Sequence, residues 1–352
     1  MNKKISNNVL NVLALLRLRG IGKAWIIKNY SDNLSEKDIV VKVNEFKKGN
    51  KISEEDFILY KDQIQQELEN ISDSVDGFVA FGDKNFPIIK KNNTSLFEND
   101  NVFISGNRNL SDEGANYPVF LAYKGDLDLL DKKHMNIAVI GLTTPNDSIK
   151  TIERKIVKEF VNNGAVIVSG LAIGCDTIAH KEALNNDGVT IAILPSTIKN
   201  IYPKENLELA ENIVLNGGLL ISEYYSEIQT SNHFKEQISR LVERDRLQAL
   251  FSDMVILTAS YSQEDTQKNK KYDSGSRHAM ENAKKYSIKR AVIYDENISK
   301  SAEFNLNNEM IKEYGSDIDL INKTNRDFKV ITKNNLKNII SSFKNYKYRQ
   351  LN

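Results

Sequence analysis

The chain has 352 residues, with 48 Lys and Arg against 47 Asp and Glu and a formal net charge of +1. At this length it can bury a substantial core in one large domain or two smaller ones, and 40% hydrophobic with 27% charged residues excludes wholesale disorder. One cysteine, Cys175, excludes an intramolecular disulfide and a cysteine-rich zinc site, and four histidines leave little for a metal cluster.

The composition also bears on partners and location. A net charge near zero argues against a wholly electrostatic nucleic-acid binder, although a local basic surface stays possible because phosphate contacts depend on placement. The basic, apolar start is interrupted by Asn11, Arg17 and Arg19, and no run approaches the roughly 20 apolar residues of a membrane span. We therefore expect a cytoplasmic protein without metal or cofactor.

Residues 1–72 are predicted to form a small all-helical N-terminal domain. Apolar residues with helical spacing begin at Val9 and are interrupted by the turn Gly20-Ile21-Gly22. The segment LRLRGIGKAW (16–25) has the form of a helix-hairpin-helix, in which Gly20 and Gly22 would expose amides to a DNA phosphate and Lys23 would add charge. Simple packing explains this pattern equally well.

Short strands follow the helical region. FVAF (78–81), VFIS (102–105) and VFLAY (119–123) are typical of strands separated by turns. From residue 136, continuous apolar strands alternate with predicted helices: the strands are IAVIG (137–141), AVIVSG (165–170), VTIAIL (189–194), GLLIS (218–222), MVILTA (254–259) and AVIYD (291–295). Such strands indicate a mostly parallel sheet covered on both faces, an α/β doubly wound fold.

This domain is predicted to span residues 73–300, with residues 301–352 completing it and ending in one helix. The polar stretch 262–273 is expected to be a mobile loop. In such sheets ligands bind at the carboxyl ends of the strands, near the point where the strand order reverses. The candidate sites are therefore the loops that follow the predicted strands.

The loop in SGLAIGCDTIAH (169–180) is the most informative of these. Gly170 and Gly174 let the backbone turn tightly, so that its amides can face an anion beside the positive end of a helix that Asp176 could cap. A purely structural turn has the same pattern. His180 and Cys175 are better explained as packed residues than as a catalytic base or a reactive thiol.

Two further segments concentrate cations. SRLVERDRLQALF (239–251) carries Arg240, Arg244 and Arg246, with acidic residues between them that would also suit a surface salt-bridge lattice. SGSRHAM (274–280) enters a helix, and its hydroxyls, amides and Arg277 could receive phosphate or form an ordinary N-cap. The sequence has no Walker-type phosphate loop, dinucleotide-binding glycine motif or nucleophile elbow.

Taken in order, these segments resemble the DprA/Smf family of DNA-processing proteins: SGLAIGCDTIAHKEAL, TIAILPS, IYPKENLELAENIV, GGLLISE, ERDRLQALFSDMVIL and SGSRHAM. GDKNFP, VFLAYKGD and MNIAVIG match upstream, so the resemblance spans roughly residues 9–340. It implies an extended Rossmann-like domain that binds single-stranded DNA, and a homodimer. It also implies a non-enzymatic recombination mediator that protects incoming single strands during natural transformation and helps load the RecA recombinase.

The resemblance also implies which residues bind DNA phosphates. They are Ser169, Gly170, Leu171, Ala172, Gly174, Lys204, Arg244, Arg246, Ser274, Gly275 and Ser276. The sequence departs from the family at Thr143, where a cation is expected, and at Asp245, which separates the two arginines. Arg277, where the family usually has an apolar residue, offers a replacement for the lost charge. The tail leaves too little chain for the C-terminal winged helix of longer members.

Two other functions stay open at this point. The altered cation positions and the polar stretch 262–273 would suit a relative that senses a nucleotide or phage DNA in a defence system. A LOG-type nucleotide phosphoribohydrolase shares the fold class, but its P-G-G-x-G-T stretch is not found. Single-stranded DNA binding is the leading hypothesis.

Overall fold

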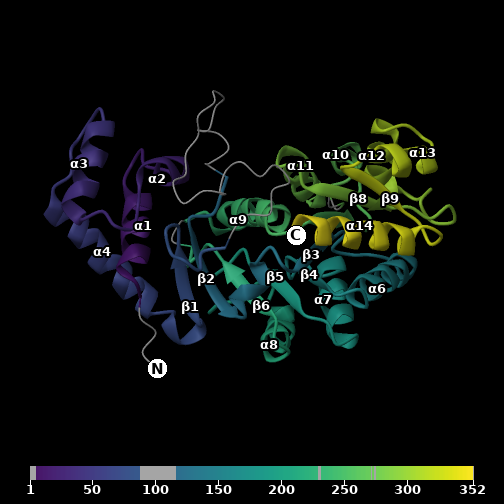
Figure 1. Cartoon of the computed structure of the whole chain (residues 1–352), viewed down its shortest axis with the longest axis horizontal. Coiled ribbons are helices and arrows are strands. Elements are labelled where there is room, and N and C mark those ends of the chain that lie inside the picture. The colour runs from purple at the N-terminus through teal and green to yellow at the C-terminus, as the bar shows by residue number, and fades with distance from the viewer. Residues whose placement is uncertain (1–4, 88–115, 229–230, 271, 273–274, 352) are drawn as a thin grey trace.

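The computed structural model describes residues 5–87, 116–228, 231–270, 272 and 275–351, and Figure 1 shows its arrangement. The predicted strand at 102–105 lies outside these residues. Within the described ranges, nine strands form one sheet in the order β1-β2-β6-β5-β4-β3-β7-β8-β9. Their bounds are β1 (Gly77–Ala80), β2 (Phe120–Gly125), β3 (Met135–Ile140), β4 (Ala165–Ser169), β5 (Thr190–Ile193), β6 (Leu219–Ser222), β7 (Met254–Leu257), β8 (Lys289–Ile293) and β9 (Phe328–Ile331).

The sheet is mostly parallel. Strands β3 to β9 pair in parallel, whereas β2 is antiparallel to both β1 and β6. The chain steps outward from β3 to β6 and then returns to the other side of β3 at β7, so the strand order reverses between β3 and β7. This confirms the predicted extended Rossmann-like, doubly wound fold and fixes its switch point.

Helices cover both faces of the sheet (Figure 1). One apolar cluster joins alternate residues of the sheet, such as Ala138 and Val168, to α9, α11, α12 and α13, while Ile137 and Ile167 face α6, α7 and α14. Full burial of every residue in β3 to β7 explains why these strands lack polar alternation. The helices are α6 (Asp147–Val161), α7 (Cys175–Asn185), α8 (Leu207–Leu215), α9 (His233–Leu250), α10 (Gln263–Lys268), α11 (Ser276–Lys285), α12 (Asn305–Glu313), α13 (Ile318–Thr324) and α14 (Leu336–Leu351).

The N-terminal region is helical over the described residues 5–69, as predicted. It contains α1 (Asn7–Arg17), α2 (Lys23–Asn29), α3 (Glu36–Phe46) and α4 (Glu54–Glu69). Capping boxes, Ser35 with Asp38 and Ser53 with Asp56, begin α3 and α4. Leu13 on α1 belongs to the same apolar cluster as Leu220 on β6, so these helices share a core with one edge of the sheet.

The structure differs from the sequence prediction in two elements. Strand β9 was not predicted, because its four residues include Lys329 within a polar surrounding. The expectation of a loop over 262–273 is wrong for α10, which begins at a capping box between Ser262 and Asp265. None of the described helices has both the length and the apolar character needed to cross a bilayer.

Candidate nucleic-acid interface

The loop after β4 is held from inside by a carboxylate. The backbone N–H groups of Gly170 and Ala172 donate to Asp176 Oδ2 at 3.0 and 3.2 Å. The N-cap of α7 is Gly174, so Asp176 braces the loop instead of capping the helix. The Ser169 hydroxyl is buried and donates to the Val139 carbonyl at 2.7 Å. Two amides and one hydroxyl of the predicted phosphate loop are therefore occupied by the chain itself.

Backbone conformation explains the sequence of this loop. Leu171 has a φ of 61° and is fully buried, so its side chain anchors a left-handed turn. Gly174 has a φ of 84°, and a Cβ there would lie 2.3 Å from the Leu142 carbonyl oxygen. Glycine at 174 thus lets the loops after β3 and β4 lie against each other.

Arg244 lies beneath this loop. Its side chain is only 5% exposed, with Nη1 3.6 Å from Asp176 Oδ2 and Nε 3.4 Å from Asp245 Oδ1. Burial raises the pKa of Asp176, although the charge of Arg244 and the backbone N–H groups oppose the shift. The sequence predicts Arg244 as a phosphate ligand, and the structure places its guanidinium behind the loop.

Arg246 is also buried, and it takes part in a cluster that joins three segments. Its Nε donates to the Asn116 carbonyl at 2.7 Å, and its Nη2 pairs with Glu223, just after β6. Lys23 Nζ lies 2.8 Å from Glu223 Oε1. Burial alone would raise the pKa of Glu223, but the charges of Arg246 and Lys23 outweigh it and lower the pKa. Lys23, predicted as a secondary DNA contact, is thus bonded to a residue at the carboxyl end of β6.

Lys204 is an exposed cation at the carboxyl edge. It begins the short 3₁₀ helix Lys204–Asn206 after β5 and forms no ion pair with any described residue. The Asn206 side chain donates from Nδ2 to the Leu171 carbonyl and to Thr177 Oγ1, both at 2.8 Å. Sequence analysis did not single out Asn206, which couples the Lys204 turn to the loop after β4.

The start of α11 meets the loop after β3. Ser276 Oγ donates to the Gly141 carbonyl at 2.9 Å, and Gly275 is the N-cap. Arg277 Nη1 lies 2.6 Å from Glu281 Oε1 on the next helical turn. The predicted site residue Ser274 lies outside the described residues.

Two stacked tyrosines lie near the switch point between β3 and β7. The rings of Tyr261, just after β7, and Tyr272 are stacked with centroids 4.0 Å apart and planes 8° from parallel. Tyr261 packs against a cluster that includes Leu142 and Phe304. The sequence offered no signal for this pair, because the two tyrosines are separated by a polar segment.

The titratable groups behind the loops are buried. His180 Nδ1 lies 2.7 Å from Thr190 Oγ1, whose hydroxyl donates to the Ile167 carbonyl, so Nδ1 carries the proton. Burial lowers the pKa of His180 to about 3. Burial likewise raises the pKa of Glu153 and of Cys175 well above their usual values. These groups form part of the buried interior.

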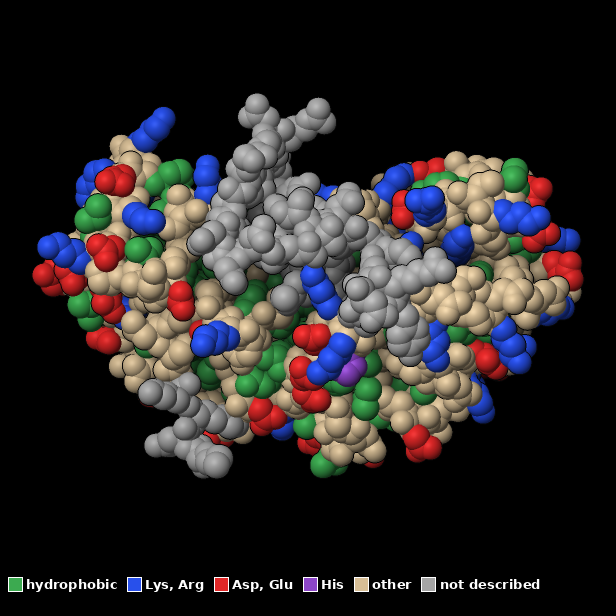
Figure 2. Space-filling view, in the orientation of Figure 1, with side chains coloured by type: hydrophobic (Ala, Val, Ile, Leu, Met, Phe, Trp, Pro, Cys, Tyr) green, Lys and Arg blue, Asp and Glu red, His purple; other side chains and the backbone are tan. Residues whose placement is uncertain are grey.

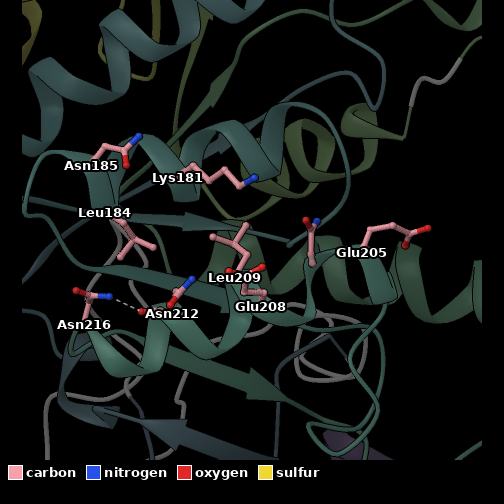
Figure 3. Close-up of a pocket in the computed structure, with 9 residues that line it drawn as sticks. Lys181, Leu184, Asn185, Glu205, Glu208, Leu209, Asn212 and Asn216 are labelled. Atoms are coloured by element: carbon pink, nitrogen blue, oxygen red, sulfur yellow. Dashed lines mark hydrogen bonds between the residues drawn. The ribbon is translucent and has the colours of Figure 1, made fainter.

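A pocket of about 380 Å³ lies between α7 and α8 (Figure 3). Lys181 and Asn185 line one side, and Asn212 lies opposite them on α8. Glu205 and Glu208 border the end nearest Lys204. Their negative charges disfavour phosphate in this pocket.

The face of the molecule seen in Figure 2 carries basic and acidic side chains interspersed over both halves. Near the N-terminus, Gly20 has a φ of 88° and Gly22 is the N-cap of α2. The space beside both glycines is open, since no atom lies within 4 Å of a Cβ built there. Their predicted DNA contact stays a prediction.

Comparison with known proteins identifies the family that this chain matches. The family described as DNA recombination-mediator protein A matches residues 94–325. The DNA processing protein DprA of Streptococcus pneumoniae is 44% identical over 108 residues, 30% of this chain and 36% of that protein. Protein Smf of Borreliella burgdorferi is 31% identical over 141 residues, 40% of this chain and 42% of that protein. Each alignment thus spans less than half of the relative's length.

Solved structures show the same fold. The X-ray structure of DNA processing protein A from Streptococcus pneumoniae superimposes with a TM-score of 0.57 at 23% identity, over 95% of this chain and 97% of that one. A structure reported for the single-stranded DNA binding mode of DNA processing protein A from Helicobacter pylori gives 0.50 at 24% identity, over 75% and 94%.

Proposed function

This chain belongs to the DNA recombination-mediator protein A family, and on that premise we propose that it binds single-stranded DNA along the carboxyl edge of its sheet. In this proposal it acts in the cytoplasm as a homodimer. It protects incoming single strands during DNA uptake and helps to load the RecA recombinase onto them. Binding, and not catalysis, is its activity.

The coupling of Lys204 to the loop after β4 carries the proposal. An exposed, unpaired ammonium group is a suitable phosphate ligand, and Asn206 fixes its distance from the turn at Leu171 through a 2.8 Å hydrogen bond. A phosphate of the strand lies at Lys204, and its neighbour lies against the outer side of the 170–174 loop. Because both contacts are to the backbone of the strand, binding does not depend on base sequence.

The two buried arginines act as positioning residues in this proposal. Arg244 supports the loop through its contact with Asp176, and Arg246 holds Glu223 at the end of β6. Asp245 accepts a hydrogen bond from Gln248 and so faces its own helix.

The switch point offers a place for a base. Tyr261 and Tyr272 are already stacked there, and a base can stack on the outer ring as on other aromatic platforms. Ser276 and Arg277 begin α11 beside the same loop. A strand running from Lys204 to α11 would thus cross the carboxyl ends of β5, β4, β3 and β7 in turn.

Fluorescence anisotropy with a labelled oligo-dT tests the proposal. Lys204→Ala should weaken binding about fivefold to tenfold, the loss typical of one phosphate contact at low salt, and should lower the slope of log K against log salt by about 0.7. Lys158→Ala is the matched control, because Lys158 is exposed on α6 without an ion pair among the described residues. No binding by the folded wild-type chain at low salt would overturn the proposal.

A further inference from the structure

A second pocket lies in the N-terminal helical region, away from the sheet edge. It has a volume of about 700 Å³, within the range of small-ligand sites. The turn between α1 and α2 provides Arg19 and Gly20, and the end of α3 with the residues that follow it provides Phe46 to Asn50. Two segments more than 25 residues apart in sequence thus form one concave surface.

The charged residues that line this pocket are all positive. Arg19, Lys47 and Lys48 line it, and no acidic residue is among the lining residues. None of the three cations forms an ion pair with a residue that the structure describes, although elsewhere in the described chain lysines and arginines pair with Asp or Glu at many positions. Three unpaired cations around one hollow favour an anionic ligand such as a phosphate group.

An exposed aromatic ring stands beside these cations. Phe46 is 55% exposed, which is unusual for a phenylalanine, and its ring packs on Trp25 with centroids 6.0 Å apart. Trp25 is only 8% exposed and therefore holds Phe46 from behind, leaving its other side to the solvent. A planar apolar ligand would bury that ring, and a phosphate attached to the ligand would reach the cations.

One turn links the pocket with the carboxyl end of β6. Lys23, at the far end of the same turn as Arg19, is bonded to Glu223 at the carboxyl end of β6. The turn thus connects the sheet edge with the pocket over a few residues. Helix α2 has seven residues, so the pocket's own side chains, and not a helix dipole, supply the positive charge.

From these observations we propose that this pocket binds one nucleoside phosphate unit, with its base on Phe46 and its phosphate between Arg19, Lys47 and Lys48. Building on the proposed function, we assign this unit to a single strand that continues past β6; a free nucleotide has the same chemistry. Single-stranded DNA of about 20 nucleotides would then bind at both sites, whereas a strand of about six would fill only the sheet edge.

The test uses the full chain with the double variant Lys47→Ala/Lys48→Ala and the single variant Phe46→Ala. Both should weaken binding of a 20-mer oligo-dT by at least fivefold and leave a 6-mer unchanged, and the double variant should lower the salt slope by about 0.7, the value for one phosphate of a single strand. Lys37→Ala/Lys158→Ala removes the same charge from exposed positions elsewhere and should leave both strands unaffected. Circular dichroism verifies that each variant is folded.

Photo-crosslinking separates this proposal from the proposed function. A 20-mer with 5-iodouracil should crosslink to the peptide that contains Phe46, and that crosslink should be lost with Phe46→Ala. Crosslinks confined to the sheet edge, with both variants binding like the wild type, would overturn the pocket while leaving the proposed function intact. Failure of all oligonucleotides with binding of thymidine monophosphate, lost in the Phe46 variant, would retain the pocket and overturn the proposed function.

An acidic peptide is the competing occupant. Hexaglutamate that displaces thymidine monophosphate from the pocket at equal concentration, with no effect of Phe46→Ala on the peptide, would show that the site recognises charge alone and would overturn the assignment to a nucleoside phosphate.

Discussion

Arg244 occupies the space that a side chain at position 170 would need. A Cβ built on Gly170 lies 0.9 Å from Arg244 Nη1, so the glycine makes room for the guanidinium, and the guanidinium in turn supports the loop. Asp176 links the two, because its Oδ2 accepts a hydrogen bond from the Gly170 N–H and lies 3.6 Å from Arg244 Nη1. The loop after β4 and helix α9 therefore form one structural unit.

Gly170→Ala should destabilise the chain by at least about 2 kcal/mol, because Arg244 must leave its place beside Asp176. Urea unfolding measures the loss. Gly49→Ala is the control, since no atom lies within 4 Å of a Cβ at that position. If the clash is the cause, the double variant Gly170→Ala/Arg244→Ala will be no less stable than Arg244→Ala alone. Additive losses would contradict this explanation.

Glu223→Gln should cost about 3 kcal/mol at neutral pH, because it leaves the buried Arg246 and the partly buried Lys23 without their shared carboxylate. The lowered pKa of Glu223 means that its contribution is present above the ordinary value of 4.5 and is lost as the pH falls through the folded value. Wild type and variant should therefore converge in stability in acid. Glu281→Gln, which removes a surface pair with Arg277, should change stability by less than about 0.5 kcal/mol.

Glu153→Gln should have the opposite pH dependence. Because the folded pKa of Glu153 is raised, the native state retains a proton that the unfolded chain releases, and wild-type stability falls as the pH rises above 4.5. Glutamine has no such proton, so the variant should equal the wild type near pH 4.5 and exceed it increasingly toward the folded pKa. Chemical denaturation at a series of pH values measures the difference. A constant difference would show that the fold does not raise the pKa of Glu153.

Asn206→Asp tests the coupling of the Lys204 turn to the loop. A carboxylate cannot donate to the Leu171 carbonyl, so the turn should loosen and binding of oligo-dT should weaken at least fivefold, with Lys204 itself unchanged. Asn216→Asp is the matched control, because Asn216 donates only to the Asn212 carbonyl at the exposed end of α8 (Figure 3). Equal binding by both variants would remove Asn206 from the site, and thermal unfolding separates a general loss of stability from a local one.

The sequence predicted the sheet well because its strands are buried on both faces. Apolar runs such as IAVIG and AVIVSG coincide with β3 and β4, and the order in which they alternate with helices indicated a parallel sheet. Strand β9 was not predicted because it has only four residues, one of them a lysine, and so shows no clear hydrophobic periodicity. Helix α10 could have been found from its capping box, Ser262 with Asp265.

The environment of the candidate residues was harder to predict. Arg246 and Glu223 are 23 residues apart, and Lys23 and Glu223 are 200 apart, so no local pattern indicates that they meet. Motif matching identified the arginines by position, whereas burial depends on the packing of α9 against the sheet. Asn206 was overlooked for a similar reason, since its partner loop lies 35 residues earlier.

The core shared by Leu13 on α1 and Leu220 on β6 bears on how this chain can be divided. A fragment beginning at residue 73 would retain all nine described strands, yet the side of β1 and β2 that α1 covers would face water. Such an apolar area would promote aggregation or recruit another protein to cover it. A gene-fusion boundary at that residue would therefore cut through one hydrophobic unit, even though the chain there changes from helices to strands.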